Sequence, residues 1–256
     1  MRTVILGTGN VAWHLAHAFI KSGIDLKQIY GRNTAALKNF KEATGIDVSS
    51  THLEKADLYL LCVSDSSLEE VSMLITDPEV LVAHTSGSLP VEVLKGPYRK
   101  ACFYPMQTFS RQAALDYSQI PFFIEAPLEK DFAALQRMAL GISSKVTRTT
   151  YSQRQYLHVS AVLCSNFVNH LFTLTKELCS AHGLEFRHFL PLIDQTVKKI
   201  HTLDPRTAQT GPAVRGDQVV LARHEALLEG HLLELYRLMS RSIARTHFGS
   251  TYGEGR

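Results

Sequence analysis

The residues with the clearest chemical meaning stand near the N-terminus, in the run Gly7-Thr8-Gly9-Asn10-Val11-Ala12. They follow a strand predicted over residues 4–6 and open a helix predicted over residues 11–22. Gly7 allows a tight turn, Gly9 lets the backbone approach a ligand, and Ala12 permits close packing of helix on strand. The helix N-terminus offers free N–H groups to a pyrophosphate. The spacing predicts dinucleotide contacts at Gly7, Thr8, Gly9, Asn10 and Val11, with a glycine turn that holds no ligand as the alternative.

The end of the second predicted strand bears on the choice of cofactor. That strand covers residues 25–30 and runs into Tyr30-Gly31-Arg32-Asn33. Enzymes that bind NAD usually carry an acidic residue there for the ribose 2′-hydroxyl, whereas Asp25 stands at the opposite end of the strand. A guanidinium suits a 2′-phosphate through a charge-assisted contact. Arg32 and Asn33 therefore favour NADP over NAD, with a solvated surface arginine as the alternative.

Polar residues follow the strand predicted over residues 57–63. Because ligands of parallel sheets bind beyond the carboxyl ends of the strands, Val63, Ser64 and Asp65 are candidate cofactor contacts. Either of the two serines that come next could simply cap the following helix, so both interpretations stay open.

The next strand, predicted over residues 80–83, ends in His84-Thr85-Ser86-Gly87-Ser88. Ser86 and Gly87 are expected near the nicotinamide, so both are candidate cofactor contacts. Ser86 is also a candidate catalytic residue, but not a hydrolase nucleophile, because no G-x-S-x-G elbow surrounds it. Further on, the loop over residues 103–109 could supply Gln107 to the wall of a substrate pocket. A core strand with a turn is the alternative.

A polar stripe interrupts the long helix predicted over residues 153–182. At about 3.6 residues per turn, His158, Ser165 and Asn169 project within about 40° of one another, with Asn166 at the margin. Polar groups on an apolar helix are costly unless they are paired. The stripe predicts a substrate site in which His158, Asn166 and Asn169 are catalytic candidates. A satisfied network at a helix or subunit interface is the alternative.

A second unusual stretch covers residues 209–217. Pro212 suits the first position of a helix predicted over residues 212–229, which places Arg215 and Asp217 in its first turn. Together with Thr210, these two side chains could bind an anionic or carbonyl substrate. The alternative is a capped helix with a surface ion pair.

The order of the predicted elements indicates the fold class. Up to about residue 150, short apolar strands alternate with helices, as in an α/β fold with a doubly wound parallel sheet. From residue 151 onward only helices are predicted, over 153–182, 186–203, 212–229 and 232–247. The first of these is apolar around most of its circumference, which is typical of a helix buried in a bundle or an interface. We expect a Rossmann dinucleotide-binding domain over 1–150, an all-α helical domain over 151–248 and a flexible tail over 249–256.

Composition narrows the class of partner. The net charge of +3 is spread along the chain, and no block of Lys or Arg indicates a nucleic-acid or membrane surface. No apolar run approaches the ~18 residues of a membrane span, and no leader pattern opens the chain, so the cytoplasm is expected. The four cysteines form no C-x-x-C pair and favour buried reduced thiols. No His, Cys, Asp or Glu cluster has metal-ligand spacing, so no metal is expected.

Taken together, six motifs resemble one family; they are residues 7–12, 30–33, 84–87, 103–109, 165–167 and 210–217. The family pairs a Rossmann-like domain with a C-terminal helical domain of unknown function, and its members are often labelled NADP oxidoreductases. It is similar to the 6-phosphogluconate dehydrogenase-like superfamily, which includes pyrroline-5-carboxylate reductase and ketopantoate reductase. The resemblance implies a homodimer formed through the helical domain, and hydride transfer at an active site between the domains.

One departure from the characterised members affects the mechanism. Hydroxyacid dehydrogenases of this superfamily place a catalytic Lys four residues before an Asn on the long helix, whereas Val162 and Ser165 precede Asn166 and Asn169 here. His158 is therefore the candidate general acid or base.

The leading hypothesis is an NADP-dependent oxidoreductase that acts on a small carbonyl, hydroxy acid or imine. The alternative is a non-catalytic dinucleotide-binding sensor or interaction protein. A third possibility within the enzyme class is a deazaflavin as hydride partner.

Overall fold

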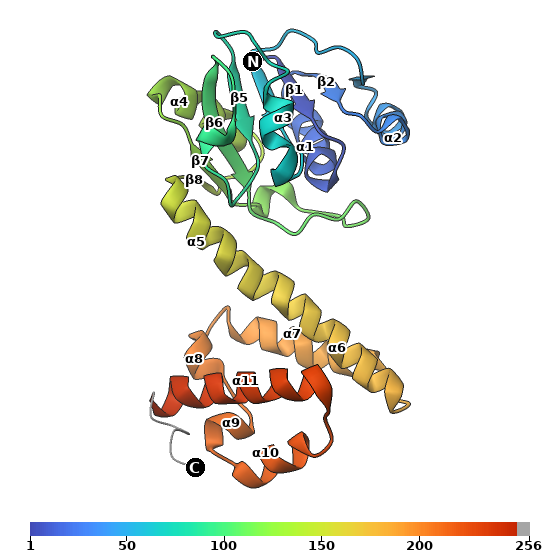
Figure 1. Ribbon diagram of the computed structural model, residues 1–256, viewed down its shortest axis with the longest axis vertical. Helices are drawn as coiled ribbons and strands as arrows, with labels where there is room; N and C mark the ends of the chain where they lie inside the picture. Colours follow the sequence, from blue (N-terminus) through green and yellow to red (C-terminus); the bar gives the residue numbers. More distant parts are fainter. Residues whose placement is uncertain (250–256) are drawn as a thin grey trace. The chain divides into compact units, whose positions relative to one another are not determined.

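The computed structural model describes residues 1–249, and within that range eight strands form one sheet (Figure 1). The order across the sheet is β3-β2-β1-β4-β5-β6-β7-β8, and β1 to β6 are all parallel to their neighbours. The predicted Rossmann arrangement is thereby confirmed. The strands are β1 (Thr3–Leu6), β2 (Leu26–Tyr30), β3 (Asp47–Ser49), β4 (Leu58–Leu61), β5 (Leu81–His84), β6 (Arg99–Pro105), β7 (Phe122–Glu125) and β8 (Val146–Arg148).

The last two strands depart from the predicted parallel sheet. β7 runs antiparallel to β6, and β8, which the sequence did not predict, runs parallel to β7. Parallel neighbours need a crossover, usually a helix. Between β6 and β7 the chain forms only the short 3-10 turn η3 (Tyr117–Gln119), whereas α4 (Glu129–Leu140) connects β7 to β8. The direction of β7 follows from this missing helix.

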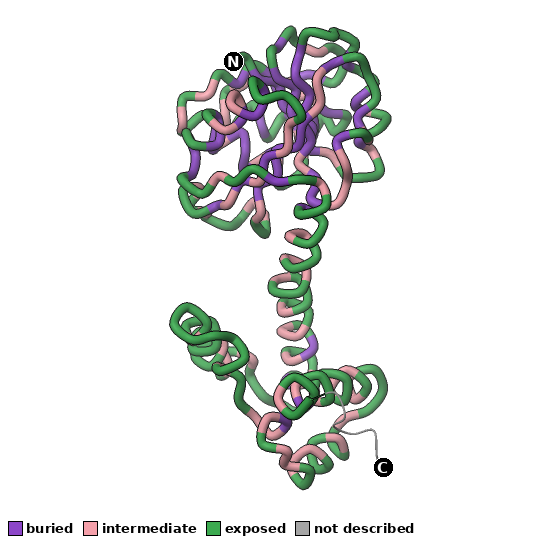
Figure 2. Tube along the Cα trace, turned by 90° about the vertical axis from the view of Figure 1, so that its left-hand side faces the viewer, coloured by how far each residue is buried: buried purple, intermediate pink, exposed green. Residues whose placement is uncertain are grey.

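Helices cover both faces of the sheet. Successive residues of a strand point to opposite faces, so Ile5 packs beneath α1 (Asn10–Lys21), α2 (Thr34–Thr44) and α4. Val4 and Leu6 pack on the other face with Leu68 of α3 (Leu68–Ser72). Figure 2 shows the buried residues gathered in this part of the chain. α3 ends at Ser72, because the N–H groups of residues 73 to 75 bond to carbonyls three residues back instead of four.

A buried polar cluster lies at the carboxyl end of β5. The imidazole of His84 is fully buried, and its Nδ1 accepts a hydrogen bond from the Ser86 N–H at 3.1 Å. Nearby, the fully buried Arg154 pairs with Glu125 of β7 and donates to the carbonyl of Leu89. Buried charges are stable only when paired in this way. These bonds attach α5 (Tyr151–Ala161) to the sheet and to the loop after β5.

By its internal contacts the chain divides into two units, Met1–Phe167 and the residues from Val168 onward. The division falls inside one continuous helical run, in which the π-helical turn η4 (Val162–Asn166) lies between α5 and α6 (Phe167–Ala181). The domain limits of 1–150 and 151–248 remain predictions, and the predicted tail lies outside the described residues beyond Gly249. The second unit continues with η5 (Phe186–Phe189), α7 (Leu190–Lys199), α8 (Pro205–Ala208), α9 (Pro212–Arg215), α10 (Gln218–Glu225) and α11 (Gly230–Phe248).

Two predictions about these helices are wrong. The helix expected over 212–229 is broken, because Gly216 adopts a left-handed φ of 66° that ends α9. Asp217 then caps α10 by accepting the Val220 N–H at 3.1 Å, instead of lying in the first turn of one helix. The predicted polar stripe assumes a uniform helical pitch, whereas η4 is a π turn. The calculated alignment of Asn169 with His158 therefore does not apply.

The helical run Tyr151–Ala181 exposes much apolar surface. Val159, Leu163 and Phe167 are each more than half exposed in the isolated chain. By length and composition alone this run of 31 residues is also apolar enough to cross a membrane, and 6% of its most apolar window is buried. Contiguous exposed apolar surface usually marks a contact with another molecule.

The buried His84 generates a prediction about acid stability. Burial, with a smaller contribution from the Arg154 cation, lowers the pKa of His84 from 6.5 to about 3. Below pH 6.5 the unfolded chain therefore gains a proton at this residue that the folded chain excludes, so stability falls as the pH falls. Between about pH 6 and about pH 5 this group should remove about 1 kcal/mol of unfolding free energy.

The variant His84→Asn keeps an acceptor for the Ser86 N–H but does not titrate. Urea unfolding at both pH values should show a weaker pH dependence in the variant than in the wild type. Parallel pH dependence in the two proteins would contradict the assignment of a neutral, buried His84.

Candidate functional site

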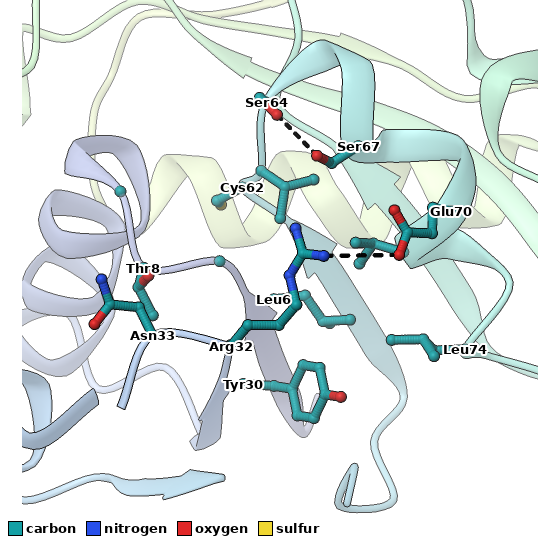
Figure 3. Close-up of a pocket in the computed structure, with 15 residues that line it drawn as sticks. Leu6, Thr8, Tyr30, Arg32, Asn33, Cys62, Ser64, Ser67, Glu70 and Leu74 are labelled. Atoms are coloured by element: carbon teal, nitrogen blue, oxygen red, sulfur yellow. Dashed lines mark hydrogen bonds and ion pairs between the residues drawn. The ribbon is translucent and has the colours of Figure 1, made fainter. Parts of the chain in front are cut away.

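A pocket of about 440 Å³ opens at the carboxyl ends of β1 and β4, where the strand order reverses (Figure 3). Open α/β sheets bind their ligands at this position. The lining comes from the glycine turn, the end of β2, the end of β4 and α3. Among the predicted cofactor contacts, the lining includes Gly7, Thr8, Gly9, Arg32, Asn33, Val63 and Ser64.

The glycine turn has the geometry that the sequence predicted. Gly7 has a φ of 127°, and a Cβ there would lie 2.2 Å from the carbonyl oxygen of Cys62. Residue 7 must therefore be glycine, both for its backbone conformation and for the close approach of β4. A Cβ on Gly9 would meet nothing within 4 Å, and Ala12 is fully buried against the core. The backbone at Gly9 therefore faces open space.

The N-terminus of α1 suits an anion. The N-cap of α1 is Gly9, and no side-chain hydrogen bond caps the helix there. The amide of Asn10 instead donates to the carbonyl of Phe109 at 3.0 Å, and Val11 packs against the core. Free N–H groups and the helix dipole at this point favour a phosphate. The residues present thus fit a dinucleotide, although Asn10 and Val11 do not line the pocket by their side chains.

Arg32 extends across the pocket toward Glu70 of α3 (Figure 3). The nearest Arg32 nitrogen lies 3.7 Å from a Glu70 oxygen, and both side chains are more than two-thirds exposed. Ion pairs this exposed contribute little, so the guanidinium is available to a stronger anionic partner. Asn33 caps α2, its side chain accepting the Ala36 N–H at 2.9 Å. Asn33 therefore has a structural role as the N-cap of α2, and its contact with the cofactor stays a prediction.

The loops after β4 and β5 are bonded to each other. The hydroxyl of Ser88 donates to a carboxylate oxygen of Asp65, and Asp65 is not among the residues that line the pocket. The hydroxyl of Ser86 accepts the N–H groups of Ser88 and Leu89 at 3.1 and 3.2 Å. Ser86 therefore shapes its own loop. Its predicted role in catalysis, like that of Asp65 in cofactor binding, stays a prediction.

The serines after β4 make no side-chain cap bond to the helices that follow, and the contact of Ser64 with a cofactor stays a prediction. Ser64 Oγ lies 2.9 Å from Ser67 Oγ (Figure 3). It also lies 3.2 Å from Ser66 Oγ. Ser67 precedes α3 without a side-chain cap bond. The hydroxyl of Ser64, which lines the pocket, thus interacts with both of the other hydroxyls.

His158 comes from α5 and lies over the loop that follows β5. Its Nδ1 lies 3.3 Å from the hydroxyl of Tyr104, at the end of β6. A Cβ on Gly87 would lie 2.7 Å from the same Nδ1, so the imidazole packs directly on the backbone of residue 87. The structure therefore brings two predicted site residues, His158 and Gly87, together at the carboxyl end of the sheet.

Three other reactive side chains nearby are unsuited to proton transfer at neutral pH. The lowered pKa of His84 keeps its imidazole neutral. Burial raises the pKa of Cys62 and Cys102 to about 12, so both remain thiols. All four cysteines are free, and Cys164 is the exposed one. Within residues 1–249, no group of three His, Cys, Asp or Glu could hold a metal ion.

Each of the remaining predicted residues has its own surroundings within its own unit. Asn166 and Asn169 are exposed on η4 and α6, and the Gln107 side chain accepts the N–H of its neighbour Thr108 at 2.8 Å. Thr210 and Arg215 are exposed in the second unit, where Asp217 caps α10. Their roles toward a substrate stay predictions.

Sequence reasoning missed a segment that supports the glycine turn. Residues 107–117 lie against α1, where His14 contacts the carbonyl of Ser110 at 2.8 Å and the hydroxyl of Tyr117 at 3.1 Å. Arg111 donates to the carbonyl of Thr8 at 2.5 Å, and its guanidinium carbon lies 5.0 Å from the ring centre of Trp13. These contacts join positions about a hundred residues apart, so no local pattern could reveal them.

The comparisons with known proteins agree with this geometry. Residues 2–86 match the family model described as NADP oxidoreductase, coenzyme F420-dependent. Residues 120–243 match a domain of unknown function, DUF2520. No curated protein matches the chain.

Solved structures extend the likeness over nearly the whole chain. The putative NADP oxidoreductase BF3122 of Bacteroides fragilis is 37% identical, with a TM-score of 0.90 over 95% of this chain and 98% of that one. Protein TM1727 of Thermotoga maritima is 23% identical, with a TM-score of 0.72 over 95% and 98%. A pyrroline carboxylate reductase of Plasmodium falciparum with NADP bound is 12% identical, with a TM-score of 0.61 over 98% of each chain.

Identity and coverage of this size, together with the pocket at the glycine turn, settle the family. The chain belongs to the same family of oxidoreductases as the Bacteroides fragilis protein, with an NADP oxidoreductase-type Rossmann domain followed by the DUF2520 domain.

Proposed function

We propose that the chain transfers a hydride between NADP(H) and a small carbonyl, hydroxy acid or imine. The observation that carries the proposal is the pocket at the glycine turn, with the exposed guanidinium of Arg32 across it. The end of β2 carries no acidic side chain for a ribose 2′-hydroxyl, and Glu70 reaches the pocket from α3. A 2′-phosphate would replace Glu70 as the partner of Arg32, because a doubly charged phosphate binds a guanidinium more strongly than an exposed carboxylate does.

The proposed roles divide between cofactor and protein. Bound NADPH supplies the hydride. The N–H groups at the start of α1 and the Arg32 guanidinium hold the phosphates, and Gly7, Thr8, Gly9 and the end of β4 shape the pocket. His158 gives a proton to the substrate oxygen or nitrogen on reduction, and takes it back on oxidation. Its Nε2 has no hydrogen-bond partner among residues 1–249, so this atom is available to a substrate.

The remaining predicted residues are assigned to the substrate in this proposal. Asn166, Asn169 and Gln107 supply amide groups, while Ser86 supplies a hydroxyl. Thr210, Arg215 and Asp217 recognise an anionic or carbonyl group of the substrate. The pyrroline ring acted on by the Plasmodium falciparum relative is a cyclic imine, which supports imines as one substrate class.

A deazaflavin is the second candidate for hydride partner of NADP. The match of residues 2–86 to a coenzyme F420-dependent family model is the observation that favours it. The described side chains of the pocket do not distinguish this partner from a small carbonyl, so it belongs in the same substrate screen.

We further propose a homodimer formed through the helical part of the chain. Val159, Leu163 and Phe167 each expose more than half of their surface on one helical run. Burying such surface against a second copy releases about 25 cal/mol for each Å². Four free cysteines support a reducing, cytoplasmic location for that dimer.

The first test measures NADPH oxidation with cyclic imines, 2-keto acids, aldehydes and an oxidised deazaflavin. We expect turnover with at least one of these classes, faster with NADPH than with NADH. The variant His158→Gln should lower kcat about 100-fold or more, because a general acid contributes this much, while NADPH binding is retained. His170→Gln, which removes an exposed histidine of α6, is the matched control. Wild-type turnover that survives in His158→Gln would remove His158 from the mechanism.

The second test measures molar mass in solution by light scattering. The wild type should show about twice the 28.6 kDa of one chain. Leu163→Glu should give the monomer, whereas Leu140→Glu, on the equally exposed end of α4, should not. A wild-type monomer, or a chain recovered only with membranes, would contradict the proposed interface.

A further inference from the structure

Tyr104 and His158 form a tyrosine–histidine pair beside the loop after β5. Their rings meet edge to face, with centres 6.1 Å apart and planes at 71°. The hydroxyl of Tyr104 lies 3.3 Å from Nδ1 of His158, and the two residues come from β6 and α5. Nδ1 is therefore occupied, whereas Nε2 on the opposite side of the ring is free within the described part of the chain.

Gly87 leaves just enough room for this pair. A Cβ at residue 87 would lie 2.7 Å from Nδ1 of His158 and 2.9 Å from Cζ of Tyr104. The φ angle of Gly87 is not positive, so the backbone conformation alone does not require glycine at this position. The two rings require it, because any larger residue would push at least one of them away.

Both members of the pair are held in place by their surroundings. Only 8% of Tyr104 is exposed, and its ring packs with Phe123 at 6.3 Å between centres. One helical turn before His158, the buried Arg154 is bonded to Glu125 and to the carbonyl of Leu89. These bonds fix the start of α5 against the same sheet, so neither ring can easily move away from the other.

The protonation of the pair is restricted by elementary chemistry. Burial raises the pKa of Tyr104, the nearby Cys102 adds to the rise and the Arg154 cation opposes it, so the phenol stays neutral. A protonated imidazole carries hydrogen on both nitrogens, so Tyr104 can then only accept from Nδ1–H. If the Tyr104 oxygen still accepts from Nδ1–H once the imidazole is neutral, the proton is lost from Nε2 alone.

We propose that Tyr104 is a positioning residue for His158, holding hydrogen on Nδ1 so that Nε2 is the atom that exchanges the substrate proton. The role rests on the proposed function, in which His158 is the general acid or base. The proton passes from Nε2–H to the substrate oxygen or nitrogen as the hydride reaches carbon, and Tyr104 neither gains nor loses a proton. Fixing one tautomer and one ring orientation is the usual task of such a partner.

The test reads the tautomer of His158 directly by nitrogen-15 NMR of the full chain, at alkaline pH where imidazoles are neutral. His158→Gln identifies the signal by its loss. In the wild type we expect hydrogen on Nδ1. In Tyr104→Phe, which removes only the hydroxyl, we expect a population with hydrogen on Nε2. Tyr117→Phe removes the corresponding hydroxyl from His14 and should leave the His158 signal unchanged.

Turnover supplies the second readout. Tyr104→Phe should lower kcat about 10-fold or more with little change in the KM for NADPH, because its effect lies in proton transfer. Gly87→Ala should shift the His158 signal in the same direction. A wild-type His158 with hydrogen on Nε2, or a Tyr104→Phe tautomer like the wild type, would overturn the proposal even if NADPH oxidation is observed. The protein could lack turnover and still show the Nδ1–H signal in the wild type and its loss in Tyr104→Phe. That result would refute the proposed function but uphold the positioning of His158 by Tyr104.

Discussion

The pocket depends on how closely two backbone segments approach each other at the point where the strand order reverses. Gly7 leaves β1 so near to the carbonyl of Cys62 that a single added carbon would overlap it. Because residue 7 has no side chain, the chain can turn there and place the N-terminus of α1 above the ends of β1 and β4. Gly7, Gly9 and Cys62 all line the pocket, so this close approach forms part of its wall.

The opposite end of the site depends on buried charge. Arg154 is fully enclosed, and its bonds to Glu125 and to the Leu89 carbonyl join α5, β7 and the loop after β5. Removing the Glu125 carboxylate would leave the guanidinium of Arg154 as an unpaired buried charge, which is strongly destabilising. The same arrangement places His158 over Gly87. The candidate acid and the cofactor pocket are therefore both attached to one sheet by contacts that tolerate little change.

Much of the fold and of the candidate cofactor site could be predicted, because the sequence patterns that indicate them are local. The glycine turn carries its own geometry, and Arg32 is identified by its place two residues beyond β2. The direction of β7 could not be read in the same way, because it depends on the absence of a crossover helix from a segment with no strong periodicity. The break at Gly216 and the π turn at 162–166 were missed because helical periodicity assumes a uniform helix. The contact of Tyr104 with His158 joins residues 54 positions apart, so only the folded sheet reveals it.

The most direct test of the central claim is a calorimetric titration with NADPH and with NADH. We expect NADPH to bind at least about 10-fold more tightly, which corresponds to about 1.4 kcal/mol. Arg32→Ala should abolish that preference by weakening NADPH alone. Lys38→Ala, which removes an exposed positive charge from α2 outside the pocket lining, should preserve it. Equal affinity for the two nucleotides, or no binding of either, would contradict the assignment of the glycine turn and Arg32 as an NADP site.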